Sequence, residues 1–196
     1  MVELHHPADV ILEIMRNRRQ ISAKSLIEPG PSTDQIEAIF YAAAQAPDHG
    51  LIRPWRFVQV PHSARDRLAE AFAAALRERS PDATAQQLQD AREKAMRGPF
   101  LTLAIADLAG KDANIPVAER LVSLGCALQN MLLMAYAQRY AAGLLSGAAL
   151  QSQALRAVFS LAETEQAVCF IVIGTAARDP KPARSRPKPD AFVSSL

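Results

Sequence analysis

The fold is constrained most by the stretch Ala46-Pro47-Asp48-His49-Gly50-Leu51-Ile52-Arg53-Pro54-Trp55-Arg56-Phe57-Val58-Gln59-Val60, which contains the only tryptophan of the chain. An apolar helical pattern ends at Ala46-Pro47, and a polar turn follows. Pro54-Trp55 then opens a segment in which apolar and polar residues alternate, which is typical of a strand with one buried face. We expect this helix, loop and strand to form the wall of a pocket.

The composition is that of an ordinary folded protein. Of 196 residues, 49% are hydrophobic and 21% are charged, and the formal net charge is +2. Because the basic residues are spread along the chain, no nucleic-acid partner is indicated. The N-terminus lacks a cationic region followed by an apolar run, and the densest apolar patch, 131–137, is far shorter than the roughly 20 residues of a membrane span. We expect a cytoplasmic protein without a membrane partner.

Hydrophobic periodicity predicts an α+β fold with a small sheet and helices on both faces. Helices are expected over 7–18, 33–46, 64–79, 81–97, 118–140 and 153–159, and strands over 56–60, 100–106 and 167–175. The helix over 118–140 is apolar nearly all round, which favours a position at the centre of the fold or in a subunit interface.

The last segment of the chain differs in composition from the rest. After Arg178, prolines and basic residues follow one another too closely for a helix or a central strand. We expect one domain over 1–178 and an extended C-terminal arm over 179–196 that reaches a neighbouring subunit.

Several familiar site patterns are missing from the sequence. It contains no GxGxxG, no phosphate-binding P-loop and no HExxH, and its four histidines and two cysteines form no metal-ligand cluster. Gly143 to Gly147 places serine one position late for GxSxG, and no histidine follows to act as its base. Cys126 and Cys169 are expected to be buried thiols in a reducing compartment. We therefore predict no metal site and assign no catalytic side chain.

Two groups of arginines remain as candidates for binding an anion. Arg18 and Arg19 follow the first predicted helix, with Gln20 and Ser22 beyond them, and Arg184 and Arg186 lie in the arm. Guanidinium groups bind phosphate bidentately, and amide or hydroxyl side chains complete such sites. The alternative is that these arginines are solvated surface charges.

Four separate motifs resemble those of the nitroreductase-like FMN-dependent oxidoreductases, in particular the short single-domain NAD(P)H nitroreductases whose pocket motif is Ala-Pro-Asp-His. The motifs are Asn17 to Ser22, Ala46 to Phe57, Gly125 to Leu133 and Arg184 to Pro187. The resemblance implies a three-layer α+β fold with a small central mixed or antiparallel sheet, and a homodimer with two FMN molecules at its interface. It also implies a ping-pong reaction in which NADH or NADPH reduces the flavin at N5 and a small conjugated acceptor, such as a nitroaromatic or a quinone, reoxidises it.

The resemblance also implies which residues bind FMN. Arg18, Arg19, Gln20 and Ser22 would hold the phosphate and ribityl chain, Arg184 and Arg186 would close on the phosphate, Pro47, Asp48 and His49 would line the ring from the other subunit, and Leu145, Ser146 and Gly147 would face the N5 side.

The chain departs from the family pattern at several of these positions. Leu51 and Arg53 replace an asparagine and a glutamine, so they are predicted to lie in the substrate pocket and to set its preference. Ser22 stands where many members have a basic residue near the pyrimidine end of the ring, and Leu144-Leu145 replaces a Trp-Arg pair. These departures leave two alternatives open: a flavin-binding module for storage, sensing or regulation with little turnover, and a helical dimer without FMN.

Individual residues also have local interpretations. Trp55 either packs in the core or contacts the flavin, and His49 either faces a ligand or makes a local hydrogen bond. Asp48 is also suited to capping backbone amides of its own loop. Lys94 and Arg97 either approach the flavin or lie on peripheral helices, and they are left outside the predicted site.

Overall fold

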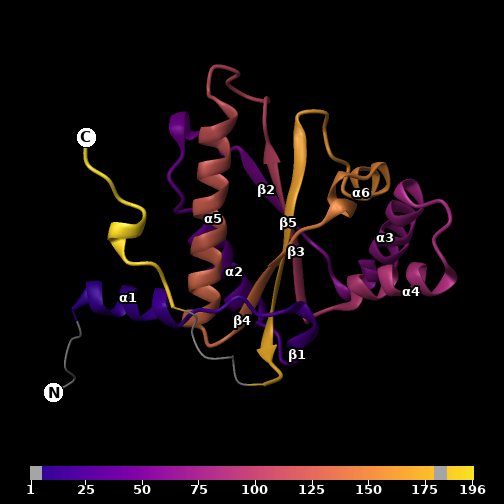
Figure 1. Ribbon diagram of the computed structural model, residues 1–196, viewed down its shortest axis with the longest axis horizontal. Helices are drawn as coiled ribbons and strands as arrows, with labels where there is room; N and C mark the ends of the chain where they lie inside the picture. Colours follow the sequence, from indigo (N-terminus) through magenta and orange to yellow (C-terminus); the bar gives the residue numbers. More distant parts are fainter. Residues whose placement is uncertain (1–5, 179–184) are drawn as a thin grey trace.

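A five-stranded antiparallel sheet forms the middle layer of the molecule (Figure 1). The computed structural model describes residues 6–178 and 185–196. The strands are β1 (Leu26–Ile27), β2 (Trp55–Gln59), β3 (Phe100–Asp107), β4 (Ala141–Leu145) and β5 (Glu165–Ala176). The order is β1-β5-β3-β2, and β4 also pairs with β5. β5 therefore holds β1, β3 and β4 together.

Helices cover both faces of this sheet, which confirms the predicted α+β, three-layer architecture. The helices are α1 (Pro7–Asn17), α2 (Thr33–Ala43), α3 (Arg65–Arg79), α4 (Ala85–Glu93), α5 (Val117–Ala137) and α6 (Gln153–Val158). α2 and α5 pack on one face, while α3, α4 and α6 lie on the other side (Figure 1). A reciprocal capping box, in which Ser32 and Gln35 bond each other's backbone amides, fixes the start of α2.

The alternation of side chains along β3 produces two separate cores. Leu103 and Ile105 belong to the core beneath α3 and α6, whereas Ala104 and Ala106 belong to the core beneath α2 and α5. Successive side chains of a strand point to opposite faces, so a strand buried on both faces is apolar at every position. The continuous apolar run that predicted a buried strand after Gly98-Pro99 is explained in this way.

The long helix α5 is buried on only one side. Leu124 and Met131 are fully buried against the sheet, but Leu121 and Val122 face outward and Val122 is 64% exposed. The apolar side chains of α1, such as Ile11 and Met15, are exposed as well, and so is Phe192 near the C-terminus. α1 and the C-terminal segment both extend from the α5 side of the molecule (Figure 1). An apolar surface thus lies uncovered on this side.

Candidate functional site

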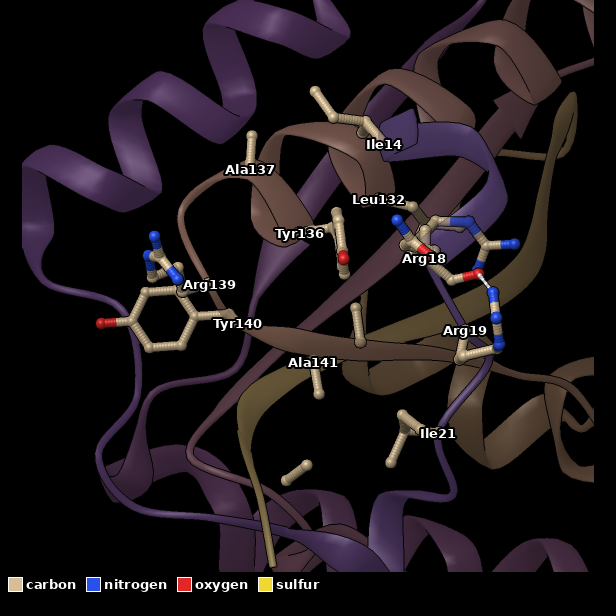
Figure 2. A pocket seen from close by; sticks show the side chains of 13 residues that line it. Ile14, Arg18, Arg19, Ile21, Leu132, Tyr136, Ala137, Arg139, Tyr140 and Ala141 are labelled. Carbon is tan, nitrogen blue, oxygen red and sulfur yellow. Dashed lines mark hydrogen bonds between the residues drawn. The ribbon is translucent and has the colours of Figure 1, made fainter. Parts of the chain in front are cut away.

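Arg18 lies where α1 ends, in a cavity of about 500 Å³. Ile14, Leu132 and Tyr136 line the same cavity (Figure 2). Within the described part of the chain, the Nε atom of Arg18 is buried and has no hydrogen-bond partner. Arg19 instead donates to the backbone carbonyls of Arg16 and Arg18, so its guanidinium is folded back against the chain. Arg18 is therefore the residue at this site whose Nε–H is free to donate a hydrogen bond to a ligand.

Positive charge accumulates around Arg18. Burial lowers the pKa of Arg18, and the positive charges of Arg186 and Arg19 lower it further. None of the ion pairs in residues 6–178 and 185–196 neutralises these three arginines. Arg184, the other arginine of the predicted pair in the arm, lies outside the described residues. Uncompensated guanidinium groups beside a cavity form a site suited to an anion such as phosphate.

The segment after Arg19 is tied to β4. The Gln20 amide donates to the Leu144 carbonyl at 2.7 Å and accepts from the Leu144 N–H at 3.1 Å, and the Ile21 N–H donates to the Ala142 carbonyl. The Gln20 side chain, predicted to contact the ribityl chain, is thus engaged with protein backbone. Ser22 is exposed and makes no capping bond. This pairing brings the arginines to the strand that ends in Leu145.

A second cavity, of about 230 Å³, lies where β4 ends. Leu145, Ser146 and Gly147 line one part of it, and Lys94 and Arg97 line another. The two basic residues were left outside the predicted site because they were equally suited to a position on peripheral helices. Their only signal was two cations just before the turn that opens a buried strand. The sequence carries no indication that they share a cavity with the β4 segment.

Arg65 fixes the backbone that carries these two basic residues. Its guanidinium is buried and donates to the carbonyls of Val60, Ala95, Arg97, Gly98 and Pro99. Burial lowers the pKa of Arg65. Because each donor of this buried cation has a backbone acceptor, the segment at Lys94 and Arg97 is held against α3.

The loop from Pro47 to Arg53 has a fixed and strained backbone. Asp48 Oδ2 accepts from the Arg53 N–H at 2.7 Å, which is the local capping contact considered for this residue. Lys111 donates to the carbonyls of Ile52 and Arg53. Gly50, Leu51 and Arg53 have φ values of 65°, 53° and 45°. For residues other than glycine this conformation costs about 1–2 kcal/mol each, so the surrounding contacts must hold it.

This strained backbone turns Leu51 outward, and its side chain is 77% exposed. Arg53 is exposed as well, and Pro47 lies at the surface beside the half-buried Asp48. The two residues predicted for the substrate pocket therefore form a protruding, partly apolar edge of one chain.

α5 supports this loop from one side. Trp55, which begins β2, is half-buried, packs on Phe57 and donates its indole N–H to Ser123 Oγ at 3.0 Å. His49 Nδ1 lies 2.6 Å from Glu119 Oε2 in the first turn of the helix. Trp55 thus anchors the strand to α5, and His49 contacts the first turn of the same helix.

The two halves of the predicted site lie at opposite ends of α5. The loop contacts Glu119 and Ser123, whereas the cavity of Arg18 is lined by Leu132 and Tyr136. At about 1.5 Å per residue, Glu119 and Tyr136 are about 25 Å apart along the helix. One chain therefore does not bring His49 to Arg18.

Other kinds of site find no support in the part of the chain that the structure describes. No group of three or more His, Cys, Asp or Glu side chains is placed to hold a metal ion there. No helix of residues 6–178 or 185–196 has the length and apolar character needed to cross a bilayer.

Comparison with known proteins identifies the family. The profile of the nitroreductase family matches residues 15–175, which is most of the chain. The chain belongs to the nitroreductase family. A Haemophilus influenzae protein named "Putative NAD(P)H nitroreductase" is 32% identical over 154 residues, which are 79% of this chain and 83% of the relative. Escherichia coli K12 YdjA, which bears the same description, is 31% identical over 185 residues, or 93% of this chain and 97% of its own.

Solved structures show the same fold. A nitroreductase-like family protein from Bacillus cereus superposes with a TM-score of 0.81 at 16% identity, and 95% of each chain is covered. The FMN-dependent nitroreductase NfnB of Mycobacterium smegmatis, solved in complex with NADPH, superposes with a TM-score of 0.68 at 17% identity over 96% of this chain and 99% of its own.

The backbone conformation of Leu51 leads to a first prediction. Asparagine tolerates positive φ better than leucine does, so Leu51→Asn should raise the free energy of unfolding by up to about 1 kcal/mol. The β-branched variant Leu51→Ile should lower it. Urea denaturation followed by circular dichroism, at one protein concentration, measures both. Equal stabilities for the two variants would contradict the left-handed conformation of residue 51.

Proposed function

We propose that this nitroreductase-family protein is an FMN-dependent oxidoreductase that passes hydride from NADH or NADPH to a small conjugated acceptor, such as a nitroaromatic or a quinone, by a ping-pong mechanism. The observation that carries the proposal is the buried, unpartnered Nε of Arg18 among three arginines that no acidic residue of the described chain neutralises. These residues fit the phosphate of FMN. When bound, FMN supplies the hydride chemistry, and the protein supplies position and electrostatics.

Each end of the cofactor has residues suited to it. Arg18 and Arg186, with Arg184 of the arm, would hold the phosphate. Leu145, Ser146 and Gly147 would lie against the ring, because the Gln20 pairing ties the arginines to β4 and β4 leads directly to this segment. The NADPH complex of NfnB supports NADPH as the electron donor, and the names of the NAD(P)H nitroreductase relatives support either dinucleotide.

Lys94 and Arg97 would supply positive charge beside the ring. They line the cavity that Leu145 to Gly147 also lines, whereas Ser22 offers no charge where many relatives have a basic residue. A cation near the pyrimidine end of a flavin favours the reduced, anionic form. We therefore assign to this pair the role that Ser22 does not fill.

Cys169 supplies no thiolate nucleophile that competes with this assignment. Cys126 and Cys169 are both free, and burial raises the pKa of Cys169 to about 11. A thiol with such a pKa stays protonated at neutral pH and is a poor nucleophile. This property agrees with chemistry carried by a bound cofactor.

The proposed active form is a homodimer with two FMN molecules at the interface. A second copy would bring its His49 loop to the Arg18 end of the first, which a single chain does not do because of the length of α5. The exposed apolar residues of α1, α5 and the C-terminal segment would then be covered. Residues 1–178 would form the FMN-binding domain, and the arm over 179–196 would cross to the partner.

The direct test follows the flavin absorption. The purified protein is expected to be yellow, to bleach when mixed anaerobically with NADH or NADPH, and to recover its colour with 1,4-benzoquinone. Stopped-flow absorbance near the flavin maximum measures both steps. FMN-loaded protein that neither donor bleaches would be a flavin-binding module instead of a reductase, and protein that takes up no FMN would contradict both functions.

The phosphate assignment is tested by Arg18→Ala. Losing a charge-assisted hydrogen bond worth about 1.5–3 kcal/mol should weaken FMN binding by roughly 10- to 100-fold. Flavin fluorescence quenching in a titration gives the affinity. Arg16→Ala, which removes an exposed arginine two residues earlier, is the matched control and should bind FMN as wild type does. Equal affinity for the two variants would place the phosphate elsewhere.

The dimer is tested at the outward face of α5. Val122→Glu would place a charge among apolar side chains of the interface, so the dissociation constant of the dimer should rise by more than about tenfold. Sedimentation velocity at micromolar concentration reports the change. Gln89→Glu adds the same charge on α4, in the opposite layer, and should leave the association unaltered. A wild-type protein that sediments as a monomer would refute the assembly.

A further inference from the structure

His49 and Glu119 form a histidine–carboxylate pair between two elements that are 70 residues apart in sequence. His49 is in the turn His49–Leu51, Glu119 is in the first turn of α5, and Nδ1 lies 2.6 Å from Oε2. A carboxylate without a proton only accepts hydrogen bonds, so Nδ1 carries the hydrogen in this contact. The described hydrogen bonds of His49 use Nδ1 alone, and its side chain is 65% exposed. Nε2 therefore remains available to another molecule.

Stability does not explain this pair. Both side chains are largely exposed, and exposed ion pairs contribute little to folding. The loop is already held without it, through the Asp48 contact to the Arg53 N–H and through Lys111. The pair fixes the orientation of the imidazole on a backbone that other contacts make rigid.

The partner of His49 is also held firmly. Glu119 is followed by Arg120, whose buried guanidinium donates to the carbonyls of Ile115, Asp107 and Asp112. These bonds attach the first turn of α5 to the loop that precedes it. A carboxylate on a helix anchored in this way sets both the ring orientation and the tautomer of the histidine that it contacts.

We propose that His49 is a catalytic residue that donates a proton to an oxygen of the bound acceptor, and that Glu119 is its positioning residue. The inference rests on the proposed function, which places the His49 loop at the flavin of the partner subunit. Of the histidines that the structure describes, His6 caps α1 and His62 lies on the turn before α3, so only His49 belongs to the predicted ring-lining loop.

The step balances for a quinone. One hydride, carrying two electrons, would pass from N5 of the reduced flavin to one quinone oxygen and leave the flavin oxidised, and one proton would pass from the His49 imidazolium to the other oxygen. The Nε2–H bond breaks and an O–H bond forms on the acceptor, which becomes the hydroquinone. The histidine is left neutral with its hydrogen on Nδ1, where Glu119 accepts it, and water restores the lost proton. General-acid catalysis of this kind contributes about 10²- to 10⁴-fold to a rate.

The test compares two acceptors after the flavin has been photoreduced, so it does not depend on NADH or NADPH. His49→Gln should slow reoxidation by 1,4-benzoquinone at least tenfold. Reoxidation by ferricyanide, which takes an electron and no proton, should be unchanged when FMN saturates both proteins. His62→Gln is the control and should match wild type with both acceptors. Equal effects of His49→Gln on the two acceptors, or no effect on either, would overturn the proposal.

A second variant tests the role of Glu119. Glu119→Gln offers Nδ1 an uncharged, weaker acceptor and also a donor, so the neutral His49 should shift in population from the Nδ1–H toward the Nε2–H tautomer. Long-range ¹H–¹⁵N correlation spectra of the full-length protein distinguish the two forms, and Glu163→Gln, at an exposed position, serves as control. Benzoquinone reoxidation should slow in Glu119→Gln but not in Glu163→Gln. An unchanged tautomer in Glu119→Gln would show that Glu119 does not position the ring. If neither NADH nor NADPH bleached the flavin of the wild-type protein, that result would refute the proposed reductase function but not the role of His49.

Discussion

Leu124, Ala127 and Met131 are fully buried where α5 packs against the sheet, and this contact fixes both ends of the helix. At the first end, Glu119 meets the loop that carries His49. At the other end, Tyr136 forms part of the wall of the Arg18 cavity. The same helix leaves its opposite face apolar and exposed. One packing contact thus sets the separation of the two half-sites and leaves free the surface through which a second copy would join them.

The helices and strands with a long apolar or periodic sequence pattern were predicted correctly. β3 is apolar from Phe100 to Ala106 except at Thr102, β5 is apolar from Ala167 to Ile173, and α5 carries apolar residues along its whole length, so local pattern and burial agree. β1 and β4 were not predicted as strands. β1 has only two residues, and β4 contains Gly143 between alanines and leucines, a composition with little intrinsic strand preference. Both form because β5 offers them a partner, and such pairing is not encoded locally.

The site was less predictable from the sequence than the fold. Arg18 was identified because arginines at the end of a helix suit an anion, and the structure adds that its Nε is buried without a partner in the described chain. Three contacts at the site join residues that are 50 or more positions apart in sequence. Gln20 is hydrogen-bonded to the backbone of Leu144, Lys94 shares a cavity with the end of β4, and His49 contacts Glu119. These contacts arise from tertiary structure, and no sequence motif or spacing predicts them.

The Arg18 cavity and the His49 loop lie at opposite ends of α5, and this separation determines how dimers of two different variants would behave. In the proposed assembly each flavin takes its arginines from one chain and its histidine from the other. Pairing a chain that lacks Arg18 with a chain that lacks His49 therefore gathers both defects at one flavin and leaves the other flavin fully equipped. Two impaired polypeptides would together restore one working centre, so this assembly would allow genetic complementation between alleles.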